Sequence, residues 1–170
     1  LGPADPAQVA ASVLEAVGLD PEVYGQRSPF ALSGGEARRA AIAGALAMQA
    51  PYLLLDEPTA GLDARGRRDV LTAISRERAR AGVVVVTHDP EELLGSATRI
   101  LALESGITAF VGTADELTDH PEAYVRAGLR LPDVVRAQVL ARQRGARIGR
   151  VELDPLPAAR VLAEAAEVDR

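Results

Sequence analysis

Two adjacent carboxylates, Asp56 and Glu57, follow a continuous apolar run over residues 52–55 and precede Pro58. An apolar run of this length predicts a strand buried on both faces of a parallel sheet, where ligands gather at the carboxyl ends of the strands. Neighbouring carboxylates repel each other, and a divalent cation or a proton-transfer role for one of them usually compensates. The pair is therefore a candidate metal and proton-transfer site, although two solvated loop acids would have the same sequence.

A second candidate site opens a predicted helix and comprises Ser33, Gly34, Gly35 and Glu36. The unpaired N–H groups at a helix start and the positive end of its dipole attract an anion, and glycine lets a phosphate approach without meeting a Cβ. Ser33 and Glu36 also have the S-x-x-E spacing of a capping box, which caps any helix. The residues alone leave both interpretations open, a phosphate site and an ordinary helix cap.

A second apolar strand, predicted over residues 83–86, places Thr87, His88 and Asp89 at the same sheet edge as Glu57. A lone histidine is usually structural or exposed. At the carboxyl end of a strand and beside a carboxylate, His88 is instead a candidate polar contact to a γ-phosphate. The expected site thus combines an anion-binding helix start, two carboxylates and a histidine.

Composition limits the classes of function. The 170 residues carry a net charge of −5, which is too acidic for a nucleic-acid binder by bulk charge, so nucleic acid is not an expected partner. The chain has no cysteine, which excludes disulfides and thiolate metal sites within it. No apolar run approaches the roughly eighteen residues that span a bilayer, and we expect a soluble protein that meets a membrane through partners.

The sequence predicts helices and a hairpin before and after these candidate residues. Asp5 and Pro6 predict the start of a packing helix, residues 20–29 a turn-rich loop, and Asp63 the cap of a helix from residue 64 to about residue 80. Residues 100–103 and 107–111 predict a hairpin, and Thr113 and Glu116 repeat the capping-box spacing. Alternating strands and helices before the hairpin predict a parallel sheet.

The composition shifts near residue 132, where Pro132 predicts another helix. Valines and a leucine on one side of this helix oppose Arg136, Arg142 and Arg144, and a last helix is expected after Asp154 through residue 162. The basic cluster of residues 136–150 lacks interleaved aromatic residues, so we interpret it as a solvated face. A dimer contact or a contact to anionic headgroups is the alternative.

Four short motifs occur in a fixed order over about sixty residues. LSGGE resembles the signature motif of ATP-binding-cassette (ABC) ATPases, YLLLDEP their Walker B strand, AGLD their D-loop and VVVVTHD their switch-histidine loop. RSPFALSGGEARRAAIAGALAM and DEPTAGLDARGRRDVL are similar to the energy-coupling factor (ECF) branch, the ATPases of vitamin, cobalt and nickel importers. PEAYVRAGLRLPDVVRAQVLARQRG is similar to the C-terminal extension of that branch.

The resemblance implies an α/β fold, part of a RecA-like P-loop NTPase domain. It predicts the remnant of a helical subdomain with the signature motif over residues 1–50. Residues 51–131 would form the RecA-like portion with the Walker B strand, D-loop and H-loop, and residues 132–170 a small helical C-terminal extension.

The resemblance also implies ATP hydrolysis with Mg²⁺ at two composite sites of a head-to-tail dimer. Asp56 would hold Mg²⁺ through water, Glu57 would orient or deprotonate the attacking water, and His88 would touch the γ-phosphate. The residues that would act on the partner's ATP are Ser33, Gly34, Gly35 and Glu36. Glu36 stands where the family more usually has glutamine, so capping is its alternative role, and Asp63 would couple the two sites.

The implied partners are a second ABC ATPase subunit in a homo- or heterodimer, a transmembrane coupling subunit and a substrate-binding membrane subunit. The expected location is the cytoplasmic face of the cell membrane, and the expected task is import of a vitamin or a transition-metal ion.

All nineteen basic residues are arginine. Without a lysine, the 170 residues cannot contain the G-x-x-x-x-G-K-[ST] loop that holds phosphates in P-loop ATPases. The chain begins with Leu1, and the family's Walker A and Q-loop precede the signature. We therefore expect a C-terminal part of an ABC ATPase that is inactive alone. One alternative is a truncated, non-catalytic subunit that donates its signature motif. A weaker one is an ABC-type ATPase of DNA repair, whose coiled-coil or zinc insertions have no counterpart here.

Overall fold

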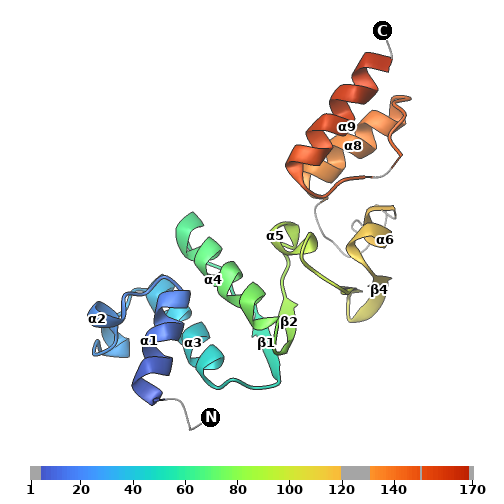
Figure 1. Ribbon diagram of the computed structural model, residues 1–170. Helices are drawn as coiled ribbons and strands as arrows, with labels where there is room; N and C mark the ends of the chain where they lie inside the picture. The colour runs from blue at the N-terminus through green and yellow to red at the C-terminus, as the bar shows by residue number, and fades with distance from the viewer. Residues whose placement is uncertain (1–4, 120–130, 150, 169–170) are drawn as a thin grey trace. The chain divides into compact units, whose positions relative to one another are not determined.

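The computed structural model describes residues 5–119, 131–149 and 151–168 (Figure 1). The chain separates into two compact units, residues 1–87 and 88–170, which are described here one at a time. The three segments expected from the sequence, residues 1–50, 51–131 and 132–170, stay a prediction. Among the described residues, no helix is both long and apolar enough to cross a bilayer.

The first unit alternates helices with two strands. Its elements are α1 (Pro6–Ala16), α2 (Pro21–Tyr24), the short 3-10 helix η1 (Pro29–Ala31), α3 (Gly34–Ala47), β1 (Tyr52–Asp56), α4 (Ala64–Glu77) and β2 (Gly82–Val86). Asp5 caps α1 as expected, because its side chain accepts the N–H of Ala7. The segment expected to be a turn-rich loop, residues 20–29, contains α2, since Asp20 accepts the N–H of Glu22 and starts a helical turn.

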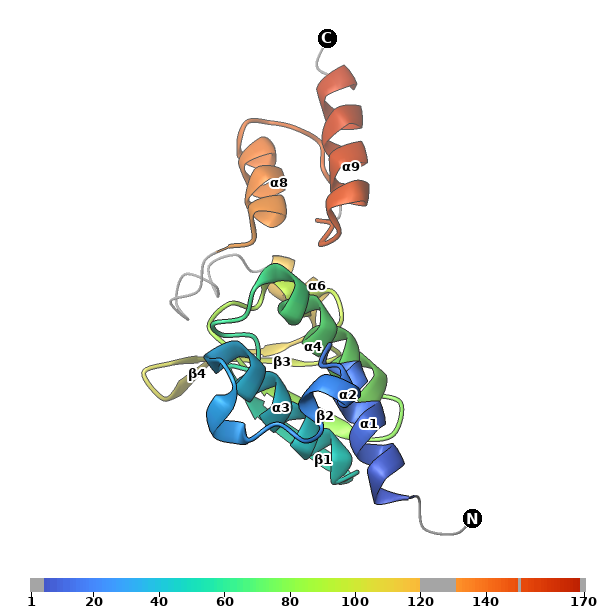
Figure 2. The same ribbon diagram turned by 90° about the vertical axis from the view of Figure 1, so that its left-hand side faces the viewer.

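The strands β1 and β2 pair in parallel, with Tyr52 opposite Gly82 and Asp56 opposite Val86. This confirms the parallel pairing that the alternating pattern predicted. Leu53 and Leu55 on one face of β1 are buried against residues of α3 and α4, and Figure 2 shows α1, α3 and α4 beside the strands.

The expectation that this sheet is buried on both faces is wrong for the described residues. Leu54 is 74% exposed, and Val84 and Val86 are more than half exposed. Side chains of a strand alternate between two faces, and the helices of the first unit cover only the face that carries Leu53 and Leu55. A continuous apolar run therefore marks a strand here without showing what covers its second face.

The second unit begins with α5 (Glu91–Leu94) and a hairpin of β3 (Ile100–Glu104) and β4 (Ile107–Gly112), which confirms the predicted hairpin. Its turn residues, Ser105 at φ +49° and Gly106 at φ +79°, have the left-handed conformation that two-residue hairpin turns favour. α6 (Ala114–Asp119) follows with the predicted capping box, in which Thr113 and Glu116 exchange hydrogen bonds of 2.8 and 3.2 Å.

Two helices, α8 (Asp133–Gln143) and α9 (Pro155–Val168), end the described chain. α9 extends beyond residue 162, where the sequence predicted its end. Gln138 on α8 is completely buried, and its amide exchanges hydrogen bonds with the Glu152 backbone, donating to the carbonyl (2.7 Å) and accepting the N–H (2.9 Å). This buried glutamine connects α8 to the segment that leads into α9. The sequence did not predict this role of Gln138.

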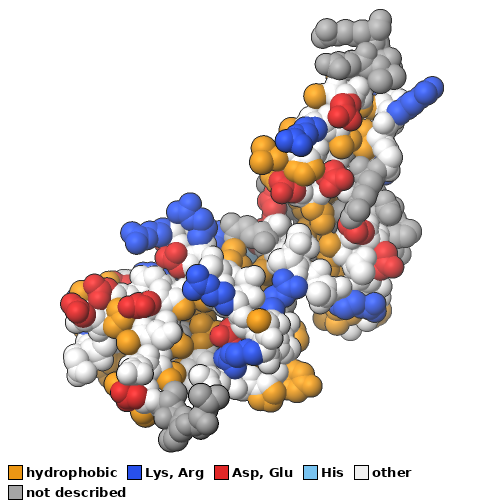
Figure 3. Space-filling view, viewed as in Figure 1, with side chains coloured by type: hydrophobic (Ala, Val, Ile, Leu, Met, Phe, Trp, Pro, Cys, Tyr) orange, Lys and Arg blue, Asp and Glu red, His pale blue; other side chains and the backbone are white. Residues whose placement is uncertain are grey.

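The predicted basic face of α8 is only partly solvated. Arg136 and Arg144 are exposed as expected. Arg142 is half-buried, and its guanidinium donates hydrogen bonds to the backbone carbonyls of Ile148 and Gly149, so it orders the loop after α8 instead of facing solvent. Figure 3 shows that, within each unit, arginine side chains on the visible face lie among acidic and apolar ones.

Candidate functional site

The start of α3 is built as the sequence predicted. Ser33 is the N-cap, its hydroxyl accepts the N–H of Glu36 at 3.3 Å, and its own N–H donates to Glu36 Oε2 at 2.7 Å. The capping box is therefore confirmed. The N–H groups of Gly34 and Gly35 belong to the first turn, where no carbonyl of the helix can accept them. The cap and an anion-binding helix start are thus compatible in one structure.

Glu36 has a further partner that the sequence did not reveal. The Tyr24 hydroxyl at the end of α2 donates a hydrogen bond of 2.6 Å to Glu36 Oε1. The Arg27 guanidinium lies over the Tyr24 ring, 4.7 Å from its centroid. The hydrogen bond from Tyr24 is the largest cause, and those from Ser33 the next, of a Glu36 pKa lowered from its ordinary value of 4.5 to about 2. The hydrogen bond to Glu36 in turn raises the pKa of Tyr24.

The carboxylate pair lies at the carboxyl end of β1. Asp56 is the last residue of the strand and is exposed, and Glu57 is half-buried. The Glu57 N–H donates to the Val86 carbonyl at 2.9 Å, and the Thr87 hydroxyl donates to Glu57 Oε2 at 3.3 Å. The structure therefore brings the end of β2 to Glu57, as the parallel pairing predicted.

Glu57 has a backbone φ of +46°, in the left-handed region that residues other than glycine seldom adopt. Such conformations cost about 1–3 kcal/mol and gather at functional sites, where surrounding contacts hold them. One of these contacts comes from the signature helix, because Arg38 on α3 donates to the Glu57 carbonyl at 2.5 Å. The next residue, Arg39, instead donates to the carbonyls of Val17 and Gly18.

The start of α3 also lies beside the turn that leads into α4. A Cβ placed on Gly35 would lie 3.7 Å from Leu62 Cδ2 and 4.0 Å from the Gly61 carbonyl oxygen. The next residue, Asp63, caps α4 by accepting the N–H of Gly66 at 2.8 Å, as predicted. Gly35 at the start of α3 therefore lies beside Gly61 and Leu62 in the first unit, although these residues are separate in the sequence.

His88 is exposed and is the first residue of the second unit. Its predicted proximity to the γ-phosphate and to Glu57 stays a prediction.

Asp56 remains the candidate residue for Mg²⁺. Within the described ranges, no group of three or more His, Cys, Asp or Glu side chains forms a ready-made metal site. Mg²⁺ in nucleotide sites is typically held by one or two carboxylates together with waters and phosphates. A single exposed carboxylate at a strand end fits that mode of binding and does not require a cage of protein ligands.

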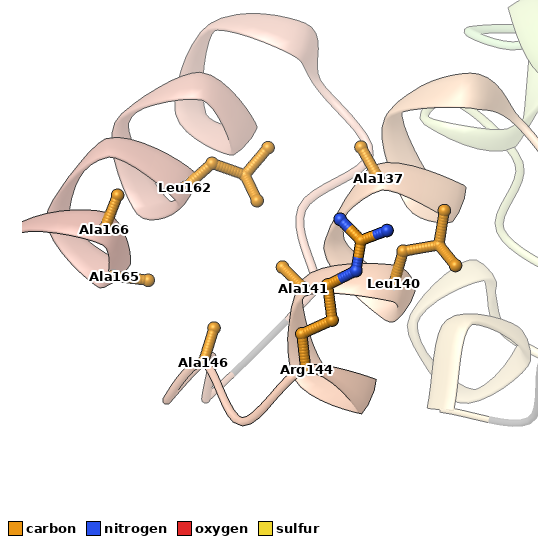
Figure 4. A pocket seen from close by; sticks show the side chains of 8 residues that line it. All are labelled: Ala137, Leu140, Ala141, Arg144, Ala146, Leu162, Ala165 and Ala166. Atoms are coloured by element: carbon orange, nitrogen blue, oxygen red, sulfur yellow. The ribbon is translucent and has the colours of Figure 1, made fainter. Parts of the chain in front are cut away.

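A shallow pocket of about 400 Å³ lies between α8 and α9 in the second unit (Figure 4). Alanine and leucine side chains from the two helices and the loop between them line it, together with Arg144. No carboxylate, hydroxyl or imidazole is among the lining side chains, and none of the predicted site residues takes part. The predicted site residues lie in the first unit, except His88, which is the first residue of the second unit.

The comparisons with known proteins agree with the motifs at this site. The family described as ABC transporter matches residues 4–60, which include the start of α3 and the carboxylate pair. The energy-coupling factor transporter ATP-binding protein EcfA2 of Listeria welshimeri is 44% identical over 133 residues, or 77% of this chain and 46% of that protein. This chain is similar to ABC ATPases in sequence. EcfA2 of Symbiobacterium thermophilum is 43% identical over 147 residues, or 85% of this chain and 50% of that protein.

Solved structures support the predicted fold of this chain. An ATP-binding subunit of an ABC transporter aligns with a TM-score of 0.65 at 23% identity, covering 75% of this chain and 56% of that one. A dimeric bacterial ABC transporter cassette aligns with a TM-score of 0.57 at 32% identity, covering 63% and 46%. The predicted fold class, a partial P-loop ABC ATPase fold, is confirmed. The chain spans about half the length of the curated relatives it matches.

Proposed function

We propose that this chain is part of the ATP-hydrolysing subunit of an ECF-type ABC transporter that drives import of a vitamin or a transition-metal ion. The observation that carries the proposal is the placement of Glu57, at the carboxyl end of a parallel strand and tied by Arg38 to the signature helix. The names of the relatives, energy-coupling factor transporter ATP-binding proteins, support the ECF assignment.

Within this proposal, each candidate residue has a role. Mg²⁺, when bound, neutralises charge on the phosphates of ATP. Asp56 holds the ion through water, Glu57 orients the attacking water or accepts its proton, and His88 contacts the γ-phosphate. The hydrogen bond from Thr87 supports this role because it fixes one carboxylate oxygen of Glu57.

The signature residues act on a second nucleotide. Ser33, Gly34 and Gly35 present the helix start to ATP that the partner subunit holds, and Asp63, which follows Gly61 and Leu62 beside this helix start, couples the two sites. The partners in this proposal are a second ABC ATPase subunit, a transmembrane coupling subunit and a substrate-binding membrane subunit. The similarity to a dimeric ABC transporter cassette supports the ATPase partner. The proposed location is the cytoplasmic face of the membrane.

A second candidate function is that of a non-catalytic subunit that donates its signature motif to a partner. The observation that favours it is the absence of lysine from all 170 residues, because the phosphate-binding loop of P-loop ATPases requires one. In that case the start of α3 contacts ATP held by the partner, while Asp56 and Glu57 do not act on a nucleotide bound by this chain.

One experiment tests the function and separates these two candidates. The purified chain is assayed for Mg-ATP binding by calorimetry and for phosphate release, alone and with a partner ATPase subunit that has its own phosphate-binding loop. We expect weak binding and no turnover alone, and turnover that depends on this chain when the partner is present. Sustained phosphate release by the chain alone would exclude the donor function, and no effect on the partner would contradict both candidates.

The transport claim needs a separate measurement. The ATPase pair is reconstituted in vesicles with its membrane subunits, and ATP-dependent uptake of cobalt, nickel and a panel of vitamins is measured. We expect uptake of one of these solutes, and a failure of all of them would contradict the import assignment.

A further inference from the structure

Glu36 carries a negative charge at the place where the proposed function requires a phosphate to approach. The positive end of the α3 dipole and the N–H groups of Gly34 and Gly35 would attract that phosphate. A carboxylate that turned toward the same space would repel it. The acidic signature motif is therefore compatible with phosphate binding only if the carboxylate is held elsewhere.

The structure shows how the carboxylate is held. Glu36 Oε2 accepts the Ser33 N–H at 2.7 Å, and Glu36 Oε1 accepts the Tyr24 hydroxyl at 2.6 Å. Both oxygens are engaged on the protein side, one by the helix cap and one by α2. The cap alone would leave Oε1 without this donor, so Tyr24 supplies the second point that fixes the carboxylate plane.

We propose that Tyr24 is a positioning residue for the signature site, whose hydroxyl holds the Glu36 carboxylate against its own helix start and away from the phosphate of ATP on the partner subunit. The statement about ATP on the partner subunit rests on the proposed function. The statement that Tyr24 fixes the Glu36 carboxylate concerns this chain alone.

Two further observations support the role of Tyr24. The Arg27 guanidinium lies 4.7 Å from the centroid of the Tyr24 ring, a distance at which a cation attracts the ring face and restricts its movement. The Glu36 carboxyl is ionised at neutral pH, and the Tyr24 hydrogen bond, the largest cause of its pKa of about 2, extends this ionisation to acidic pH. Protonation therefore cannot remove the repulsion, and position is the remaining way to limit it.

The first test measures the Glu36 carboxyl directly. Its pKa is determined by carbon-13 NMR in the wild-type chain, in Tyr24→Phe and in Tyr52→Phe, which removes the hydroxyl of a largely exposed tyrosine on β1. We expect Tyr24→Phe to raise the pKa toward the ordinary value of 4.5 and Tyr52→Phe to leave it unchanged. An unchanged pKa in Tyr24→Phe would overturn the proposal.

The second test measures the consequence for the partner's ATP. The chain is combined with a partner ATPase subunit, and KM and kcat are measured for wild type, Tyr24→Phe, Glu36→Gln and the double variant. We expect Tyr24→Phe to raise KM roughly three- to tenfold with a smaller change in kcat, as lost ground-state binding does. In the Glu36→Gln background the same change should have little effect, because no carboxylate is left to position.

The outcomes separate this inference from the proposed function. If the wild-type chain does not support hydrolysis by the partner, the proposed function fails, and the Glu36 pKa in Tyr24→Phe still decides whether Tyr24 positions the carboxylate. If hydrolysis is supported but Tyr24→Phe raises KM equally with and without Glu36, Tyr24 has only a structural role and the proposal is overturned.

Discussion

At the scale of single residues, Glu57 is held by hydrogen bonds to residues of α3 and of the end of β2. Its N–H donates to Val86 on β2, its carbonyl accepts Arg38 of α3, and its side chain accepts Thr87. These bonds offset the cost of its left-handed backbone. Arg38 is of particular interest because it joins the helix proposed to contact the partner's ATP to the residue proposed to act on the subunit's own ATP.

We predict that Arg38→Ala in an active ATPase dimer lowers kcat by about tenfold, since a hydrogen bond to a charged group contributes about 1.5 kcal/mol. ATP affinity should stay within about twofold, because Arg38 touches the backbone of Glu57 and not the nucleotide. Steady-state kinetics and equilibrium nucleotide binding measure the two effects. Arg68→Ala, which removes an exposed arginine from α4, is the control. Equal kinetics for the two variants would show that the contact has no catalytic role.

The low pKa of Glu36 predicts a specific pH dependence of stability. Some carboxyl groups have a lower pKa in the folded state than in the unfolded state. Such a group stabilises the fold at any pH above its unfolded pKa, and this stabilisation is lost as the pH falls toward its folded pKa. For Glu36 the loss should occur between about pH 4.5 and about pH 2. Urea unfolding midpoints across this range should fall more for the wild type than for Glu36→Gln. Parallel pH profiles would contradict the contribution of Glu36.

At the scale of secondary-structure elements, the sequence predicted the local features best. The capping boxes at Ser33 and Thr113 depend on residues three positions apart, and the hairpin depends on the short turn at residues 105–106. Such contacts form between neighbours in the chain, so spacing alone reveals them. The parallel pairing of β1 and β2 followed from the order of strands and helices.

The contacts that the sequence did not predict join residues that are distant along the chain. Tyr24 and Glu36 are twelve positions apart, and Gln138 and Glu152 are fourteen apart. Their pairing depends on how α2 packs near α3 and how the segment before α9 packs on α8, which no local pattern specifies. The exposed face of β1 and β2 was missed for the same reason, since an apolar strand has the same sequence whether one face or both are covered.

The two faces of the sheet and its helices give an element-scale prediction. Val70 on α4 is completely buried, whereas Val84 on β2 is 52% exposed. The same substitution to alanine should therefore lower the free energy of unfolding by about 2 kcal/mol at Val70 and by less than about 0.5 kcal/mol at Val84. Urea denaturation of the two variants measures the difference. A loss at Val84 as large as that at Val70 would show that the outer face of the sheet is covered in solution.

At the scale of the whole molecule, the motifs and the comparisons show a chain similar to ABC ATPases, and the proposed function adds that each ATP is shared between two subunits. The structure places the signature helix start beside Gly61 and Leu62 of the same chain, so position alone does not say which nucleotide it serves. A functional test must therefore distinguish action within the subunit from action on the partner.

Nucleotide trapping in heterodimers with one variant subunit is the most direct test. A subunit that carries this chain behind its own phosphate-binding loop is paired with a wild-type partner, and photo-crosslinkable ATP shows which subunit holds the stalled nucleotide. Gly35→Asp adds a side chain and a negative charge where the partner's phosphate would approach, and Glu57→Gln removes the proposed base, which typically slows hydrolysis by about 10² or more. We predict stalled nucleotide on the partner for Gly35→Asp and on the variant subunit for Glu57→Gln. Stalled nucleotide on the same subunit for both variants would contradict the shared-site account.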